Sequence, residues 1–215
     1  MLEKGKKRIE DKERKIKEKA MISFREKGVE KTSIRDIMKD TKFGLGTFYL
    51  YFKNKKNLEQ KIVLDLLVEL FYKAEKQCVG NEPVQRYISF MDYILDYFIA
   101  HPIEFELISK NINWALYAKI ENDERFEEVD SILKFVLDKF STIFPENYTK
   151  HQQLYILSLT MHTVISTCKH SLSKDGILTI DEMKPVLFKL IEKIFKEEEK
   201  WKNSQNMCQN TQKQY

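Results

Sequence analysis

The sequence predicts an all-helical protein with two domains. Its 215 residues include only six glycines and four prolines, so helix-breaking positions are rare. Apolar residues recur at intervals of three or four rather than in alternation, which is the period of a helix that packs on one face. The length is sufficient for one or two modest domains with a hydrophobic core.

The first four predicted helices are amphipathic segments, and glycines mark two of the boundaries between them. Gly28 ends the first of them, and Gly44 precedes the third. The predicted elements are a helix over 9–27, a short helix capped by Thr32 or Ser33, a short helix over 45–52, and a long helix from about Asn57. Two short helices joined by a tight turn and packed on a first helix form a helix-turn-helix unit.

Five longer helical patterns fill the rest of the chain. They cover 83–100, 103–117, 123–144, 149–173 and 179–202. Prolines 102 and 145 mark two of the boundaries, because the residue before a proline avoids helical geometry. Thr179 and Glu182 have the spacing of a capping box at the start of the last helix. Residues 203–215 have little to bury and are predicted to be disordered.

Charge is distributed unevenly along the chain. Residues 1–60 contain eighteen Lys and Arg against ten Asp and Glu, whereas the whole chain carries a net charge of only +4. A basic module on a slightly acidic body suggests a polyanionic partner at one end. The alternative is an ordinary solvated lysine-rich surface.

Several other classes of protein are not expected. No apolar run approaches the roughly 20 residues of a membrane span, and the charged N-terminus lacks the apolar segment of a secretory signal. Three scattered cysteines predict neither a disulfide framework nor a metal site, so a cytoplasmic location is expected. The four histidines have no metal-ligand spacing, and no phosphate loop or nucleophile motif occurs. We therefore expect no enzyme activity and no cofactor.

The stretch KFGLGTFYLYFKNK, residues 42–55, combines aromatic rings with positive charge. Phe48 and Phe52 are four residues apart and therefore share one face of the third helix, which we expect to lie on the core. Tyr49 and Tyr51 then point elsewhere, beside the lysines. Hydroxyl and ammonium groups on one face are suited to contact phosphates.

Residues 14–58 resemble the DNA-binding domain of the tetracycline-repressor (TetR) family. The resemblance rests on Ala20, Phe24 and Gly28, on the segment TSIRDI from Thr32, and on GTFYLYF from Gly46, followed by Lys53, Lys55 and Leu58. It implies an N-terminal helix-turn-helix domain followed by a larger helical domain that binds a ligand and dimerises. The predicted domains are therefore 1–56, 57–202 and a tail at 203–215.

The resemblance also implies which residues contact DNA. Arg35 is expected to reach a base edge or phosphate, Thr47 and Tyr51 to face the groove, and Tyr49 and Lys55 to anchor phosphates. The full set of predicted DNA-binding residues is Thr32, Ser33, Arg35, Leu45, Gly46, Thr47, Tyr49, Tyr51, Lys53 and Lys55.

Thr32, Ser33 and Leu45 each leave an alternative open, and Lys42 departs from the family pattern. Thr32 and Ser33 could equally be helix caps alone. Leu45 could meet a thymine methyl group or cover an edge of the core. Lys42 stands where the family often has glycine, so we expect it to adopt a left-handed conformation at a cost of about 1 kcal/mol.

The predicted function is that of a DNA-binding transcriptional regulator, a ligand-responsive repressor that binds a pseudo-palindromic operator in double-stranded DNA. A homodimer is expected, because the helix over 179–202 is apolar on more than one face and could join 149–173 in a four-helix interface. The alternative is a membrane-surface or protein-interaction module with a basic N-terminal helix, although the apolar stripe of that helix is thin.

The effector is predicted to be an apolar or amphipathic small molecule. Residues 83–173 are rich in aromatic and methionine side chains, which line most small-molecule pockets. The predicted ligand-binding residues are Tyr93, Tyr97, Trp114, Tyr117 and His162. Each combines an apolar body with a polar tip. The alternative is that these rings are ordinary core residues.

Overall fold

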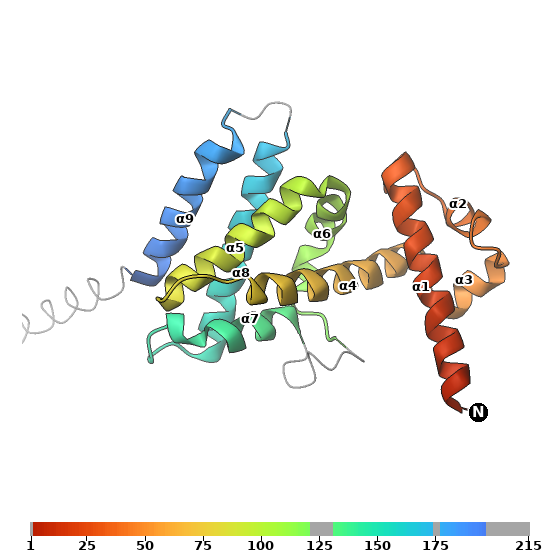
Figure 1. The fold of residues 1–215 in the computed structure, drawn as a ribbon, viewed down its shortest axis with the longest axis horizontal. Coiled ribbons are helices and arrows are strands. Elements are labelled where there is room, and N and C mark those ends of the chain that lie inside the picture. The colour runs from red at the N-terminus through yellow and green to blue at the C-terminus, as the bar shows by residue number, and fades with distance from the viewer. Residues whose placement is uncertain (1, 121–130, 174–176, 197–215) are drawn as a thin grey trace, which may run out of the picture. The chain divides into compact units, whose positions relative to one another are not determined.

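A computed structural model describes residues 2–120, 131–173 and 177–196, and all regular structure in these residues is helical (Figure 1). The predicted all-α fold class is thus confirmed. The helices are α1 (Leu2–Lys27), α2 (Ile34–Lys39), α3 (Leu45–Tyr51), α4 (Lys55–Lys76), α5 (Pro83–Ala100), α6 (Pro102–Ala115), α7 (Ile132–Phe140), α8 (Lys150–Ser171) and α9 (Ile180–Lys196). A short 3-10 turn over Ser141–Ile143 follows α7.

Two helices differ from the prediction. Helix α1 begins at Leu2 rather than at residue 9, so it continues through the charged N-terminal residues. In the described part of the range 123–144, helix α7 begins only at Ile132, because Ser131 is extended and caps it through a hydrogen bond from the N–H of Lys134. The first part of that predicted range and the predicted disordered tail at 203–215 lie outside the described residues.

The chain forms two compact units. One consists of Met1–Glu69 with His101–Ala115, and the other of Leu70–Ala100 with Leu116–Tyr215. Helix α4 therefore contributes residues to both. The functional boundary predicted after residue 56 stays a prediction.

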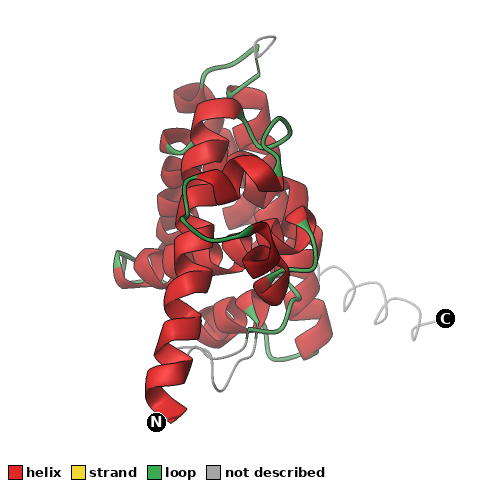
Figure 2. Cartoon of the chain, turned by 90° about the vertical axis from the view of Figure 1, so that its right-hand side faces the viewer, coloured by secondary structure: helices red, strands yellow, loops and turns green. Residues whose placement is uncertain are grey.

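The first unit is built on the apolar face of α1. Ile16, Ala20 and Phe24 recur every four residues and are fully buried. Helix α1 contacts α2, and α2 contacts α3. Phe48 and Phe52 of α3 are also buried, as their spacing predicts, and their ring centroids lie 5.3 Å apart. Phe48 and the C-cap residue Phe52 therefore hold the short α3 on the core. Figure 2 shows the described part of the chain as helices joined by loops.

The ends of these short helices follow local rules. Gly28 has a φ of 82° and its N–H bonds the carbonyl of Phe24, which closes α1. Ser33 is the N-cap of α2: it accepts a hydrogen bond from the N–H of Asp36 at 3.1 Å, and Asp36 accepts one from the N–H of Ser33 at 2.9 Å. Lys42 has a φ of 60°, so the predicted left-handed conformation is confirmed.

Two ion pairs join α6 to the helix-turn-helix within this unit. A guanidinium nitrogen of Arg25 contacts the carboxylate of Glu104, which is almost fully buried. Lys110 contacts Glu30 at 2.7 Å, in a pair that is mostly exposed. Because a buried carboxylate depends on its partner and an exposed one does not, Arg25–Glu104 is the stronger structural link of the two.

The second unit packs α5 against α8 and α9, with α7 on α8. Its core is aromatic: Tyr87 lies 5.2 Å from Phe140 and 5.5 Å from Phe195 between ring centroids. The hydroxyl of Tyr87 is hydrogen-bonded to that of Thr160 inside this core. Lys184 of α9 pairs with the carboxylates of Asp92 and Asp96 on α5.

Across the residues that the structure describes, no helix combines the length and the hydrophobicity needed to cross a membrane.

Candidate nucleic-acid interface

The surface of α3 opposite the core is the centre of the candidate interface. Phe48 faces inward, and successive helical residues are offset by 100°, so Gly46 and Leu50 face away from the core. Leu45, Tyr49 and Leu50 are all exposed, with Leu50 at 80%. The outer face of this seven-residue helix is therefore largely apolar, and the sequence LGTFYLY carries no charged group.

Leu50 was missed by the sequence prediction. That prediction placed Tyr49 and Tyr51 on the outward side of the helix and assigned no role to Leu50. Helical spacing could have found it, because Leu50 lies two residues from each of the core anchors Phe48 and Phe52 and so points to the other side.

Exposed cations both precede and follow α3 in the chain. Arg35 and Lys39 belong to α2, Lys42 to the turn before α3, and Lys53 and Lys56 to the segment after it. In the part of the chain that the structure describes, none of these five charged groups forms a hydrogen bond or an ion pair. We refer to these five residues as the flanking cations. Their charges remain available to a polyanion.

Other cations of the first unit are used internally. Lys17 contacts Asp65 at 2.8 Å, and Lys61 contacts Glu13 at 3.1 Å. These contacts hold α1 and α4 together. The two lysines, aided by their hydrogen bonds, hold the pKa of the half-buried Glu13 carboxyl below its usual value although burial acts to raise it.

Lys27 has a comparable structural task. Its ammonium lies 2.6 Å from a carboxylate oxygen of Asp36. This hydrogen bond, together with those from the hydroxyl and N–H of Ser33, holds the pKa of Asp36 far below its usual range. The contact joins the end of α1 to the start of α2, so Lys27 stabilises the fold and its charge already has a partner.

The structure places most of the predicted DNA contacts on this surface. Arg35, Leu45, Gly46, Tyr49 and Lys53 are exposed. Thr47 and Tyr51 are partly exposed on the flank of α3. The ring of Tyr49 packs edge-on against Phe48, with centroids 5.3 Å apart, while the residue as a whole stays exposed. Their roles toward DNA stay predictions.

Thr32 does not fit the prediction. Its side chain is 2% exposed, and its hydroxyl donates to the carbonyl oxygens of Gly28 at 2.8 Å and Ser23 at 3.1 Å. The hydroxyl therefore stabilises the loop between α1 and α2 and is not available to DNA. Ser33, its neighbour, is exposed and acts as the cap of α2.

Lys55 is placed differently from the other predicted phosphate anchor, Tyr49. Its side chain is 23% exposed, and its ammonium donates to the carbonyl oxygen of Val29 and lies 3.5 Å from that of Glu30. Lys55 thus fastens the start of α4 to the loop between α1 and α2. A phosphate contact from Lys55 stays a prediction, although its ammonium group already has carbonyl partners within the protein.

The predicted effector residues are not gathered into one described pocket. Tyr93 and Tyr97 lie on α5, and His162 lies on α8, where its Nδ1 is 2.6 Å from the carbonyl oxygen of Ser158. Tyr117 follows α6 and is exposed, as is Trp114, which belongs to the other compact unit. None of the five lines the pockets that the structure describes.

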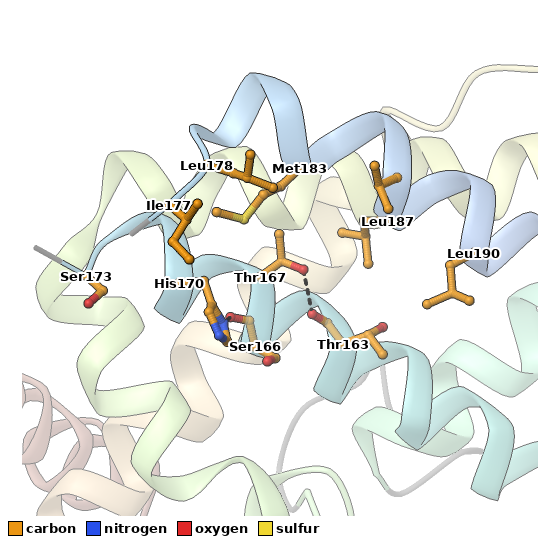
Figure 3. A pocket seen from close by; sticks show the side chains of 11 residues that line it. Thr163, Ser166, Thr167, His170, Ser173, Ile177, Leu178, Met183, Leu187 and Leu190 are labelled. Atoms are coloured by element: carbon orange, nitrogen blue, oxygen red, sulfur yellow. Dashed lines mark hydrogen bonds between the residues drawn. The ribbon is translucent and has the colours of Figure 1, made fainter. Parts of the chain in front are cut away.

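A groove of about 630 Å³ instead lies between α8 and α9 (Figure 3). One wall is polar and comes from α8, with Thr163, Thr167 and His170; the other is aliphatic and includes Leu187 and Leu190 of α9. The sequence prediction named this helix pair as a dimer surface and not as a groove. Among the described residues, no cluster of His, Cys, Asp and Glu could hold a metal ion.

Comparison with known proteins agrees with this geometry. Residues 16–61 match the family model described as bacterial regulatory proteins, tetR family. An uncharacterized HTH-type transcriptional regulator, YhgD of Bacillus subtilis (strain 168), is 28% identical over 130 residues, which are 60% of this chain and 67% of that protein.

Solved structures match most of this chain at lower identity. A TetR-family transcriptional regulator from Syntrophomonas wolfei has a TM-score of 0.56 and 23% identity, with 86% of this chain and 95% of that chain covered. The regulator FadR from Bacillus subtilis, solved in complex with stearoyl-CoA, has a TM-score of 0.54 and 16% identity, with 82% and 96% covered. Both alignments extend well beyond the helix-turn-helix.

Proposed function

We propose that this chain, which belongs to the TetR family of bacterial regulatory proteins, is a DNA-binding transcriptional regulator that represses its target genes as a ligand-responsive homodimer. The observation that carries the proposal is the outer face of α3 with the flanking cations on both sides of it. An exposed recognition helix between available positive charges is suited to the major groove with a phosphate strand on either side.

The contacts divide into two kinds. Lys53, Lys56 and the hydroxyl of Tyr49 contact phosphates, which positions the unit without reading sequence. Arg35, Thr47 and Tyr51 contact base edges, because they lie on or beside α3 where it would enter the groove. Leu45 and Gly46 lie on the same helix and allow a close approach to the bases.

A two-fold dimer through α8 and α9 accounts for the apolar surface of the second unit. Leu187 and Ile191 of α9 are buried within the chain, whereas Val186 and Leu190 on the adjacent face stay exposed. Tyr155 and Leu159 form a matching exposed stripe on α8. One α3 reads only a few base pairs, so two copies on a pseudo-palindrome supply the affinity that a single copy lacks.

The effector is an apolar or amphipathic small molecule bound by the second unit. The FadR structure with stearoyl-CoA shows that this fold accommodates a ligand of that class in a distant relative. Tyr93, Tyr97, Tyr117 and His162 remain the proposed contacts in this unit, whereas Trp114, which was predicted with them, belongs to the first unit. The ligand would bind the DNA-incompetent state more tightly, with α4 as the coupling element because it contributes to both units.

The first test is selection of binding sites from random double-stranded DNA by the purified full chain. We expect enrichment of a pseudo-palindrome and an affinity that falls steeply with salt, as counterions are no longer released. Thermal-shift screening of acyl and aromatic compounds, followed by measurement of operator release, tests the effector. No enrichment of any sequence, together with binding that is insensitive to salt, would contradict the proposed function.

A further inference from the structure

We propose that Leu50 reads thymine in the operator through the 5-methyl group that this base presents in the major groove. The inference rests on the proposed function and specifies which base in the operator is recognised by α3. Thymine is the only base with a methyl group in the major groove, so an apolar side chain can distinguish it without a hydrogen bond.

The exposure of Leu50 is the first support. A single exposed leucine is common on protein surfaces and needs no explanation. Here Leu45, Tyr49 and Leu50 are all exposed on a helix of seven residues, and Leu50 is the most exposed of the three. No described part of the first unit covers this face, so the apolar surface is presented outward.

The chemistry of α3 is the second support. The helix contains no Arg, Lys, Asn, Gln, Asp or Glu, which are the side chains that make the strongest hydrogen-bonded contacts with guanine, adenine or cytosine. Its polar groups are the hydroxyls of Thr47, Tyr49 and Tyr51. Because a hydroxyl can bond to more than one base, discrimination between bases by the outward face of α3 rests mainly on shape and apolar contact.

Gly46 gives Leu50 access to the bases. It lies one turn before Leu50 on the same face, and a Cβ added there would meet no protein atom within 4 Å. The φ of Gly46 is also not in the left-handed region. Packing thus does not require glycine at this position. Without a side chain there, the backbone of α3 can approach the floor of the groove, and Leu50 can reach a base edge.

The surrounding charge identifies the occupant as a nucleic acid. Arg35 and Lys39 lie on one side of α3 in the chain, and Lys53 and Lys56 lie on the other, all exposed and without hydrogen-bonded or ion-paired partners among the described residues. An apolar patch for a protein partner would gain little from available cations of one sign on both sides. A duplex supplies two phosphate strands with a groove of base edges between them.

Replacement of thymine by deoxyuridine tests the inference, because it removes the methyl group and keeps the base pair. The operator is the sequence enriched by the wild-type chain, and each thymine of a half-site is replaced in turn. We expect at least one replacement to weaken binding about fourfold, which corresponds to about 0.8 kcal/mol for one buried methyl-sized group. If no thymine is sensitive, the inference is overturned while DNA binding itself stands.

A double-mutant cycle then assigns the methyl contact to Leu50. Leu50→Ala is expected to bind the thymine operator more weakly than the wild type does. Its affinity should not change when deoxyuridine replaces thymine at the sensitive position. Leu50→Met, which remains apolar, should keep the sensitivity. Ile22→Ala removes an exposed aliphatic side chain from α1 and should behave like the wild type. If deoxyuridine weakens binding of Leu50→Ala by the same factor as it weakens binding of the wild type, another residue reads the methyl group and the inference is wrong.

Discussion

Two surfaces of this chain leave large aliphatic side chains in solvent, and they differ in the charge that surrounds them. On α3, Leu50 is 80% exposed and is flanked by Arg35 and Lys53, whose charges have no described partner. Around the α8–α9 groove, Ile177 is 96% and Val186 67% exposed. None of the described residues that line this groove is a lysine, arginine, aspartate or glutamate (Figure 3).

The comparison shows that exposed apolar area alone does not identify a partner. Both surfaces are candidates for binding, because contiguous apolar patches are uncommon on monomeric proteins. Available cations beside α3 favour a polyanion, whereas a groove between two long helices whose described lining includes no lysine, arginine or carboxylate favours a second copy of the chain or an apolar ligand. The predictions below test this division, from the largest expected effect to the smallest.

The largest effect is expected from charge placed on the α8–α9 surface. In a two-fold dimer, Val186→Glu with Leu190→Glu would bring like charges together in an apolar interface. We expect sedimentation at the mass of one chain, 25.8 kDa, and an operator affinity about 100-fold lower because the second half-site is lost. Val79→Glu, at an exposed aliphatic residue between α4 and α5, is the control. A dimer that persists at micromolar concentration would remove α8–α9 from the interface.

Removal of two flanking cations should have the next largest effect. Lys53→Ala with Lys56→Ala should weaken DNA binding about tenfold at moderate salt and make the log–log salt slope shallower by about two. The preference among operator variants should stay the same, since phosphate contacts carry no sequence information. Lys119→Ala with Lys139→Ala changes the net charge equally in the second unit. If this control lowers the affinity as much, net charge and not position explains the effect.

Lys55→Ala separates a structural lysine from a phosphate anchor. Because its ammonium donates to the carbonyl of Val29, we expect the free energy of unfolding to fall by about 1 kcal/mol and Tm by about 2–4 °C. Lys53→Ala should leave Tm unchanged. Differential scanning calorimetry and salt-dependent binding distinguish the roles: an unchanged Tm with a salt slope shallower by about one would make Lys55 a phosphate anchor after all.

The smallest effect concerns the capping box of α2. The lowered pKa of Asp36 means that its ionised form stabilises the folded state above the ordinary carboxyl value of 3.8, and that this stabilisation is lost as the pH falls below it. Asp36→Asn should therefore lower Tm at pH 7, and its difference from the wild type should shrink in acid. Asp40→Asn, an exposed carboxylate at the other end of α2, is the matched control. A difference in Tm that is independent of pH would contradict the assignment.

Local signals in the sequence were sufficient for much of the fold and for the position of α3, the centre of the candidate interface. Gly28, the N-cap Ser33, and the pair Thr179 and Glu182 have the roles that the sequence indicates. The reason is that helix ends are satisfied by residues within four positions along the chain. Likewise, the four-residue spacing of Phe48 and Phe52 determines which face of α3 lies on the core.

The tertiary structure decided which polar groups remain available. Lys53 and Lys55 are two residues apart and have the same intrinsic chemistry, yet Lys55 meets a carbonyl 26 positions away and Lys53 meets solvent. The sequence offered Thr32 as a possible N-cap, but its hydroxyl donates a hydrogen bond to the carbonyl oxygen of Ser23. The sequence by itself thus determined where helices begin, end and face the core. Only packing could decide which charges and hydroxyls stay open to DNA, because their partners come from distant segments that no local pattern specifies.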